Sequence, residues 1–379
     1  MIYLDNGATS YPKPDVVADA VYDYIKNVGS NINRGNYAKA YSAAEVVLET
    51  RELINEMMNG YGARYTVFTP GNTYGLNFLI KGLARPNDKF IVSGMEHNAV
   101  YRPIHQLTEN GTITVEYMPC NENGELIPEE ALPMIDENVR AVICVHASNV
   151  SGTLMPLKEL GERCAEKNVL FLVDAAQTAG NTPIDMQAWH IDGLTIPGHK
   201  SMLGPQGVGA MLIRPELANE LVPLVAGGTG SHSDLADMPE EMPDRFESGT
   251  LNLPGIFGLH AACQWLNEHG AEVRSHEKEL TQRMLDGLRD VDGIRVAGLP
   301  TSEGRVGVIS VDFLNGDNGM VAFQLEQEYG IMTRVGLHCA PLAHKSLHTF
   351  PEGTVRFSIG PFNTEEDIDT AVEAVKALA

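Results

Sequence analysis

Short apolar runs alternate with amphipathic stretches through much of the chain, and this order constrains the fold more than any other feature. The apolar runs predict strands over residues 65–69, 89–93, 112–118, 139–146, 169–174, 193–197 and 209–214. The amphipathic stretches predict helices over residues 15–28, 42–59, 75–84, 156–167 and 216–221. Because parallel strands need a long crossover, which is usually a helix, this order is typical of an α/β domain with a mostly parallel sheet. Ligands of such sheets bind beyond the carboxyl ends of the strands.

The pattern changes after about residue 252, where a second structural unit is expected. Amphipathic stretches predict helices over residues 254–269, 277–291 and 365–378. Short strands are expected over residues 295–297, 306–312, 330–334 and 354–358. Because no Pro/Gly-rich linker separates the units, they are expected to pack together. We therefore expect a large domain over residues 12–253 and a smaller α+β domain made of residues 1–11 and 254–379.

The charge and the cysteines argue against several classes of function. The 379 residues include 27 basic and 50 acidic ones, a formal net charge of −23, and such a field repels nucleic acid and anionic membranes. The sequence has neither a long apolar segment nor the basic-then-apolar start of a signal peptide, so we expect a cytoplasmic protein without membrane contact. The five cysteines form no CxxC pair and the 12 histidines show no ligand spacing, so neither a disulfide framework nor a bound metal is expected.

Two polar side chains follow predicted strands in a way that suggests cofactor chemistry. Asp174 ends the apolar run 169–174, and Lys200 follows the run 193–197. Taken alone, the lysine is typical of a solvated surface, and the aspartate of a helix N-cap or a buried hydrogen bond. Pyridoxal 5′-phosphate (PLP), however, needs a lysine amine for its Schiff base and a carboxylate that keeps its ring nitrogen protonated. Together the two residues predict a PLP enzyme that carries its cofactor on Lys200.

Segments spread along nearly the whole chain resemble one family. They match, in the family's order, the class V PLP-dependent aminotransferase-fold enzymes, and among these the Suf-type cysteine desulfurases and selenocysteine lyases. The matching segments are 3–9, 33–35, 69–73, 95–98, 148–153, 173–177, 198–200, 245–252 and 334–341. The resemblance implies the PLP-dependent transferase fold type I, PLP as cofactor and a homodimer with shared active sites. It also implies release of alanine from L-cysteine or L-selenocysteine, with a sulfur- or selenium-acceptor protein as a partner.

The resemblance gives roles to residues around the cofactor ring. Lys200 would form the Schiff base and later move the Cα proton, and Asp174 would pair with the ring nitrogen. His97 would stack on the ring face, although without the family it resembles an ordinary histidine at a helix start. Gln177 would hydrogen-bond the ring hydroxyl oxygen, and Asn149 would face the same edge of the ring or the substrate.

Further residues are implied for the phosphate group. Thr73 opens a predicted helix after a glycine turn, so its hydroxyl and the nearby backbone N–H groups suit a phosphate, although a helix N-cap alone would also explain it. His199 would add a phosphate contact. Thr250 would reach the phosphate bound to the neighbouring subunit, which is the basis of the expected shared active site.

The substrate is assigned to an arginine and a cysteine. Arg356 alternates with apolar residues in the predicted strand 354–358, so one face is expected to be buried with the arginine on the other. The resemblance implies that the guanidinium of Arg356 clamps the substrate carboxylate. Arg34 would add a contact to the substrate or to the other subunit of the dimer. Cys339 lies in a loop bounded by glycine and proline, where the neighbouring His338 could favour the thiolate. The resemblance implies that Cys339 attacks the substrate sulfur and becomes a persulfide.

The chain also departs from the family. Pro197, Asn33, Tyr74 and Leu337 stand where the family usually has a hydroxyl residue, His, Glu and His, respectively. These differences leave substrate preference and partner docking open. Another class V reaction (transamination, epimerisation or carbon–sulfur β-elimination) and a non-catalytic scaffold with a PLP fold remain as alternatives.

Overall fold

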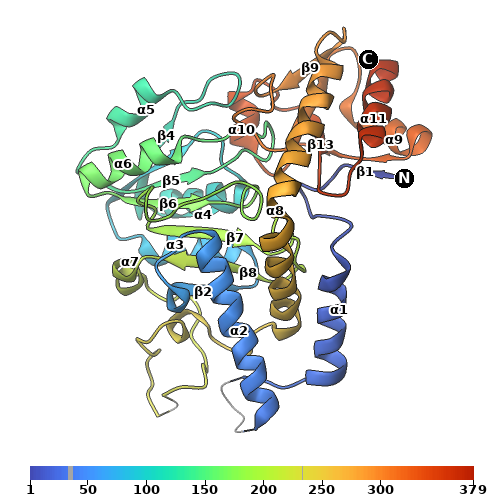
Figure 1. Cartoon of the computed structure of the whole chain (residues 1–379). Coiled ribbons are helices and arrows are strands. Elements are labelled where there is room, and N and C mark those ends of the chain that lie inside the picture. The colour runs from blue at the N-terminus through green and yellow to red at the C-terminus, as the bar shows by residue number, and fades with distance from the viewer. Residues whose placement is uncertain (33–36, 233) are drawn as a thin grey trace.

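The central sheet of the computed structural model has seven strands in the order β2-β8-β7-β6-β5-β3-β4 (Figure 1). The structure describes residues 1–32, 37–232 and 234–379. β8 pairs antiparallel with β2 and β7, and the other pairs are parallel, so the expected α/β fold with a mostly parallel mixed sheet is confirmed. The predicted strands of this part are present within one residue of their expected limits. They are β2 (Thr66–Thr69), β3 (Asp88–Ser93), β4 (Ile113–Met118), β5 (Val139–Val145), β6 (Leu170–Asp174), β7 (Gly193–Pro197) and β8 (Gly209–Ile213).

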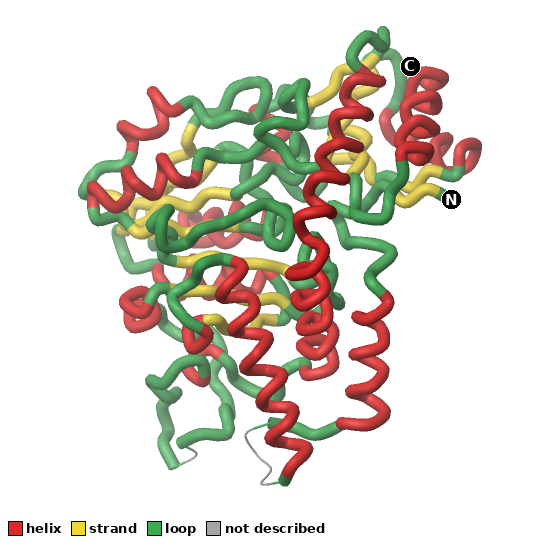
Figure 2. The backbone as a smooth tube through the Cα atoms, viewed as in Figure 1, coloured by secondary structure: helices red, strands yellow, loops and turns green. Residues whose placement is uncertain are grey.

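Helices cover both faces of this sheet (Figure 2), which is why its strands are apolar on both sides. Ala141 and Ile143 of β5 pack with α3, α4 and α7, whereas Val142 and Cys144 pack with α2, α5, α6 and the first part of α8 (Leu253–Leu288). This alternation follows from the two-residue period of a strand. The helices are α2 (Ala38–Met57), α3 (Asn72–Leu83), α4 (Asn98–Glu109), α5 (Pro128–Met134), α6 (Leu157–Lys167) and α7 (Pro215–Glu220).

A second, smaller sheet is antiparallel and has the strand order β12-β13-β10-β9. Apolar side chains of this sheet form one hydrophobic core with α9, α11 and the last part of α8. The first strand of the chain, β1 (Ile2–Tyr3), pairs in parallel with β11 (Ile331–Met332), so both termini lie on this side of the molecule (Figure 1). The other elements are β9 (Ile294–Ala297), β10 (Val308–Phe313), α9 (Asn318–Tyr329), β12 (Arg334–Gly336), α10 (Pro341–Ser346), β13 (Thr354–Ser358) and α11 (Glu365–Leu378).

Two expectations about individual elements are wrong, and a third is confirmed with a change of helix type. The helices predicted over 254–269 and 277–291 are one continuous helix, α8 (Leu253–Leu288). The strand predicted over 330–334 is divided between β11 and β12, which belong to different sheets. The helix predicted over 15–28 is confirmed, as α1 (Asp15–Asp23) followed by a π-helical turn over Tyr24–Val28. Tertiary packing decides these details, and the periodicity of a single sequence carries no information about that packing.

The limits of the two expected domains stay a prediction. α8 contacts α1 and α2 as well as α11 and β10, so one helix packs on elements of both expected domains. This packing agrees with the absence of a linker in the sequence. Among the described residues, no helix has the length and the apolar character needed to cross a membrane.

Candidate active site

Residues from separate strands meet around one cavity at the carboxyl end of the large sheet. The cavity has a volume of about 320 Å³. Asp174 ends β6, Lys200 follows β7 and Asn149 follows β5, and all three line the cavity. His97, after β3, and Thr73, in the first turn of α3, also line it. The sheet topology therefore brings these side chains to one place, as the strand order requires.

One carboxylate oxygen of Asp174 is held by hydrogen bonds, and the other accepts none from the residues that the structure describes. Its Oδ1 accepts hydrogen bonds from Asn72 Nδ2 at 2.8 Å and from the Ala176 N–H at 2.9 Å. Burial raises the pKa of Asp174, while these hydrogen bonds and Lys200 oppose the shift. Oδ2 can therefore receive the N–H of a pyridinium ring. Sequence reasoning does not single out Asn72, and its only signal is its position within the matching segment 69–73.

The amine of Lys200 lies in surroundings that make it easier to deprotonate than an ordinary lysine amine. Burial lowers the pKa of Lys200 to about 8, although Asp174 acts in the opposite direction. The neutral amine is the form that attacks an aldehyde carbon. The preceding backbone is fixed, because the His199 carbonyl oxygen accepts a hydrogen bond from the Ser10 N–H at 3.0 Å.

Two histidines at the cavity are neutral near pH 7. Burial lowers the pKa of His97 to about 3, with Lys200 acting in the same direction, and burial lowers the pKa of His199 to about 4. His97 is the N-cap of α4, and its Nδ1 accepts a hydrogen bond from the Ala99 N–H at 3.0 Å. The ring hydrogen of His97 therefore lies on Nε2. A neutral imidazole can lie against a heteroaromatic ring without the cost of burying a charge.

The residues present fit PLP. The carboxylate of Asp174 suits the ring nitrogen, and the amine of Lys200 suits the aldehyde carbon. The N-terminus of α3, a helix of 12 residues, offers backbone N–H groups to a phosphate beside Thr73. His199 Nδ1 and Asn72 Oδ1 are buried without a hydrogen-bond partner in the described part of the chain. Buried polar atoms of this kind are expected where a polar ligand belongs.

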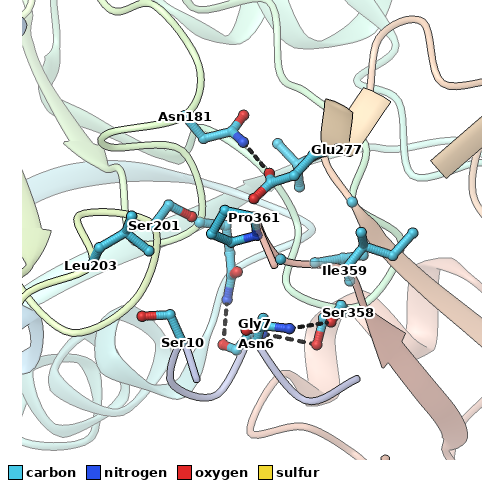
Figure 3. Close-up of a pocket in the computed structure, with 15 residues that line it drawn as sticks. Asn6, Gly7, Ser10, Asn181, Ser201, Leu203, Glu277, Ser358, Ile359 and Pro361 are labelled. Atoms are coloured by element: carbon cyan, nitrogen blue, oxygen red, sulfur yellow. Dashed lines mark hydrogen bonds between the residues drawn. The ribbon is translucent and has the colours of Figure 1, made fainter. Parts of the chain in front are cut away.

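A second, much smaller cavity lies beside the first (Figure 3). Its volume is about 30 Å³, which suits about one water molecule and is too small for a cofactor. Asn181 donates a hydrogen bond to Glu277 at its wall, and burial raises the pKa of Glu277 to about 8. Gln177 lines both cavities, and its Nε2 donates to the Gly7 carbonyl oxygen at 3.1 Å. Gln177 thus joins the cofactor cavity to the N-terminal segment.

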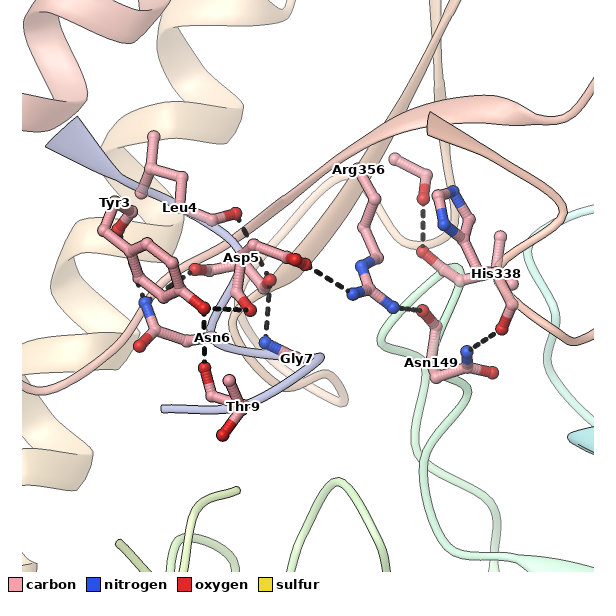
Figure 4. Close-up of polar contacts among 12 residues, drawn as sticks. Tyr3, Leu4, Asp5, Asn6, Gly7, Thr9, Asn149, His338 and Arg356 are labelled. Atoms are coloured by element: carbon pink, nitrogen blue, oxygen red, sulfur yellow. Dashed lines mark hydrogen bonds and ion pairs between the residues drawn. The ribbon is translucent and has the colours of Figure 1, made fainter. Parts of the chain in front are cut away.

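Arg356 is buried at the centre of β13. It is 2% exposed, and all five residues of the strand are buried, so the expectation of one covered face is wrong. Its Nη2 donates to Asp5 Oδ1 at 2.8 Å and its Nη1 to the Asn149 carbonyl oxygen at 3.2 Å (Figure 4). Burial lowers the pKa of Arg356, while the Asp5 carboxylate opposes the shift. The N-terminal segment covers the face that was expected to be open, because Gly7 lies against the guanidinium.

Cys339 lies in a loop that is tied to the cofactor cavity. Cys339 is exposed, and its backbone carbonyl oxygen accepts a hydrogen bond from the Asn98 N–H at 2.7 Å. The side-chain amide of Asn149 donates to the His338 carbonyl oxygen at 2.7 Å (Figure 4). Asn149 therefore contacts the cysteine loop with its side chain and Arg356 with its backbone.

The expectation that His338 favours a thiolate on Cys339 is wrong. His338 is buried, and its Nε2 lies 3.1 Å from both the carbonyl oxygen and the hydroxyl oxygen of Thr354. Burial, together with Arg356, lowers the pKa of His338 to about 2. The imidazole is therefore neutral and brings no positive charge to the cysteine, so its role is to hold the loop on β13.

Some residues implied by the resemblance lie elsewhere. Thr250 is exposed, and it lines two other cavities and not the one that Lys200 lines. Arg34 and Asn33 lie outside the described residues. Pro197 and Tyr74 both line the cofactor cavity, so these departures from the family change its wall directly.

The fold and the cavity define a class of protein, the PLP-dependent enzymes of fold type I. The model of the family described as aminotransferase class-V matches residues 2–371, and the chain belongs to this family. The family's cofactor is PLP, which agrees with the residues around the cavity.

Relatives cover nearly the whole chain. A probable cysteine desulfurase of Methanothermobacter thermautotrophicus is 33% identical over 385 residues, covering 100% of this chain and 94% of the relative. A cysteine desulfurase of Haloferax volcanii is 30% identical and covers 100% of this chain and 89% of the relative. The solved apo structure of a cysteine desulfurase from Thermococcus onnurineus has a TM-score of 0.93 at 29% identity, covering 100% of this chain and 94% of that one.

Proposed function

We propose that the protein is a cysteine desulfurase that removes sulfur from L-cysteine, releases alanine and carries the sulfur as a persulfide on Cys339. The relatives with cysteine desulfurase names support the reaction. The observation that carries the proposal is the exposed thiol of Cys339 on a loop bonded to Asn149, whose own carbonyl oxygen binds Arg356. Asn149 thereby connects Arg356, which would bind the substrate carboxylate, to the loop that carries the nucleophile Cys339.

Substrate binding depends on Arg356 and Lys200. The guanidinium of Arg356 holds the α-carboxylate, which places Cα near the Lys200 amine and the substrate sulfur near the loop of Cys339. Arg34 adds a contact to the substrate. His97, Asp174 and Gln177 hold the cofactor ring, and the phosphate is held by Thr73, His199 and the partner subunit's Thr250.

Carbon–sulfur cleavage is shared between Lys200 and Cys339. Bound PLP supplies an electron sink for the pair left on Cα. The Lys200 amine takes the Cα proton, and the Cys339 thiolate attacks the substrate sulfur. As the S–S bond forms, the Cβ–S bond breaks and its electron pair passes to Cβ, which then takes up a proton. The protonated Lys200 amine returns a proton to Cα. The products are alanine and the Cys339 persulfide, so the atoms of cysteine are all accounted for.

The proposal extends to a second substrate and to partners. L-selenocysteine fits the same carboxylate and amine contacts, and its weaker carbon–selenium bond needs Cys339 less. A homodimer with shared active sites explains why Thr250 lies on the surface of a single chain. A sulfur- or selenium-acceptor protein then takes the atom from the exposed Cys339. The charge and the absence of a membrane helix among the described residues agree with a cytoplasmic enzyme.

Replacing the proposed nucleophile tests the reaction. We expect Cys339→Ala to lower alanine formation from L-cysteine by at least about 100-fold, because no thiolate remains to take the sulfur, while the visible absorbance of bound PLP is unchanged. Alanine, sulfide and pyruvate are measured in parallel, and selenide release from L-selenocysteine is expected to be retained.

Cys120→Ala is the matched control. Cys120 is a half-buried thiol whose pKa is raised to about 12 by burial, and it does not line the cofactor cavity. We expect the control to keep full activity. Unchanged alanine formation by Cys339→Ala would contradict the persulfide step. Pyruvate or a keto acid in place of alanine would assign the chain to another class V reaction. If the pure protein binds no PLP, the chain would instead be a non-catalytic scaffold with a PLP-enzyme fold.

A further inference from the structure

The guanidinium of Arg356 already has a carboxylate partner within the chain (Figure 4). Asp5 Oδ1 accepts a hydrogen bond from Nη2 at 2.8 Å, and the Asn149 carbonyl oxygen accepts one from Nη1 at 3.2 Å. Nε is buried and has no hydrogen-bond partner among the residues that the structure describes. A bidentate clamp for an incoming carboxylate uses two guanidinium nitrogens, and Nη2 belongs to both edges that offer such a pair. Nη2 carries one N–H on each of these edges, and Asp5 uses one of them. A second carboxylate on the same nitrogen would be repelled by Asp5 and would share the same single positive charge, so Asp5 and a substrate carboxylate compete for Arg356.

The segment that carries Asp5 also keeps Arg356 in place by packing. Asp5 forms a parallel bridge with Ser358, and the Gly7 N–H donates to Ser358 Oγ at 2.8 Å. A Cβ on Gly7 would lie 3.4 Å from Arg356 Cζ, so the backbone at Gly7 lies against the guanidinium. Arg356 is thus positioned by close packing and by the Asn149 carbonyl oxygen, independently of the Asp5 carboxylate.

The two charged groups differ in their access to water. The side chain of Arg356 is 2% exposed, whereas that of Asp5 is 22% exposed. A buried guanidinium without an anion is costly, so Asp5 stabilises Arg356 when no substrate is present. A carboxylate at the edge of the site can be rehydrated when it leaves, which keeps the cost of its displacement low.

We propose that Asp5 is the resident counter-ion of Arg356, which the α-carboxylate of the substrate displaces, and that Asp5 thereby sets the affinity for the substrate. The inference rests on the proposed function, in which Arg356 binds that carboxylate. Binding exchanges one ion pair for another, so the enzyme gains only the difference between the two. Removal of the Asp5 charge leaves the guanidinium in place with its positive charge uncompensated, and a carboxylate ligand then binds more tightly.

Equilibrium binding of a cysteine analogue tests this role. The probe is 3-mercaptopropionate, which has the carboxylate and the thiol of cysteine without its amine, titrated calorimetrically into PLP-loaded enzyme. We expect Asp5→Asn to bind it about ten-fold more tightly than the wild type, a change between those typical of exposed and of buried ion pairs. Asp5→Glu, which keeps the charge, is expected to bind within about two-fold of the wild type.

Asp312→Asn is the matched control. Asp312 pairs with Arg295 at 3.2 Å in the same small sheet, and its side chain is 18% exposed, close to the 22% of Asp5. We expect both Asn variants to melt at a lower temperature than the wild type without ligand, but only Asp5→Asn to bind the probe more tightly. Unchanged or weaker binding by Asp5→Asn would overturn the inference, because a residue that merely positions Arg356 gives that result.

A third variant and a structure separate the two proposals. Arg356→Gln is expected to lose binding of the probe; if it binds like the wild type, the carboxylate site of the proposed function fails together with the role of Asp5. Loss of binding in Arg356→Gln without tighter binding in Asp5→Asn overturns the role of Asp5 alone.

A crystal structure of the wild-type enzyme with the probe tests displacement without any variant. In it, the 2.8 Å contact between Asp5 and Arg356 is expected to be broken, and an intact contact beside bound probe contradicts displacement.

Discussion

At the scale of single residues, two buried aspartates separate a cofactor role from a structural one. Asp174 ends β6 at the edge of the sheet that carries the cavity. Asp192 lies just before β7, at the opposite edge, where its Oδ2 accepts a hydrogen bond from the Phe171 N–H at 2.7 Å and its Oδ1 pairs with Arg214 at 2.8 Å. Both are buried, so burial alone does not distinguish them.

Replacing each aspartate by asparagine is expected to give different results. We expect Asp174→Asn to lower kcat by about 100-fold and to shift the visible absorbance of the cofactor, because an amide cannot keep the ring nitrogen protonated. Asp192→Asn is expected to leave the absorbance unchanged and to lower the free energy of unfolding by about 1–3 kcal/mol, because it weakens a buried hydrogen-bonded pair. Absorbance spectra and denaturant unfolding check both, and equal spectral changes in the two variants would contradict the assignment.

Residue types and spacing predict part of the site, and long-range contacts complete it. Lys200 and Asp174 could be found because Asp174 ends one apolar strand and Lys200 comes shortly after another, and parallel strands bring their carboxyl ends to one edge. The contact between Asp5 and Arg356 joins residues 351 positions apart, and no local pattern contains it. The same holds for His338, whose pKa is lowered mainly by burial, and its imidazole contacts Thr354 of β13.

At the scale of elements, α8 shows why helix limits are difficult to predict. Gly270 and the polar residues after it favour a break, because glycine has a low helix propensity. In the structure Gly270 is buried inside one helix from Leu253 to Leu288, whose two parts pack on different sheets. Burial on both sides outweighs the local preference, so the strands of the central sheet were predictable within a residue while this helix was not.

Two glycines in helices test this balance. A Cβ on Gly270 would meet only the end of the flexible Arg274 side chain, at 3.3 Å, so Gly270→Ala is expected to raise the free energy of unfolding by about 0.5–1 kcal/mol. A Cβ on Gly161 in α6 would overlap the Trp189 carbonyl oxygen, so Gly161→Ala is expected to lower the free energy of unfolding by about 1–3 kcal/mol. Urea unfolding of both variants gives the sign, and destabilisation by Gly270→Ala would show that α8 does not tolerate a side chain there.

At the scale of the whole molecule, the site is assembled from parts that no single segment contains. The large sheet supplies Lys200 and Asp174, the small sheet supplies Arg356, and the N-terminal segment supplies Asp5. The alternation of strands and helices predicts the two units, but the way in which they meet depends on packing between β13, the N-terminal segment and the Asn149 loop. The order of family-like segments predicted more of the site than periodicity did, because it carries information about that assembly.

The central claim is that sulfur from L-cysteine is transferred to Cys339 while alanine is formed. Mass spectrometry of peptides after a single turnover, without reductant, tests it most directly. We expect the peptide that contains Cys339 to gain the mass of one sulfur atom, with one alanine formed for each persulfide. Alanine formed without added sulfur on Cys339, or sulfur found on Cys120 instead, would contradict the account.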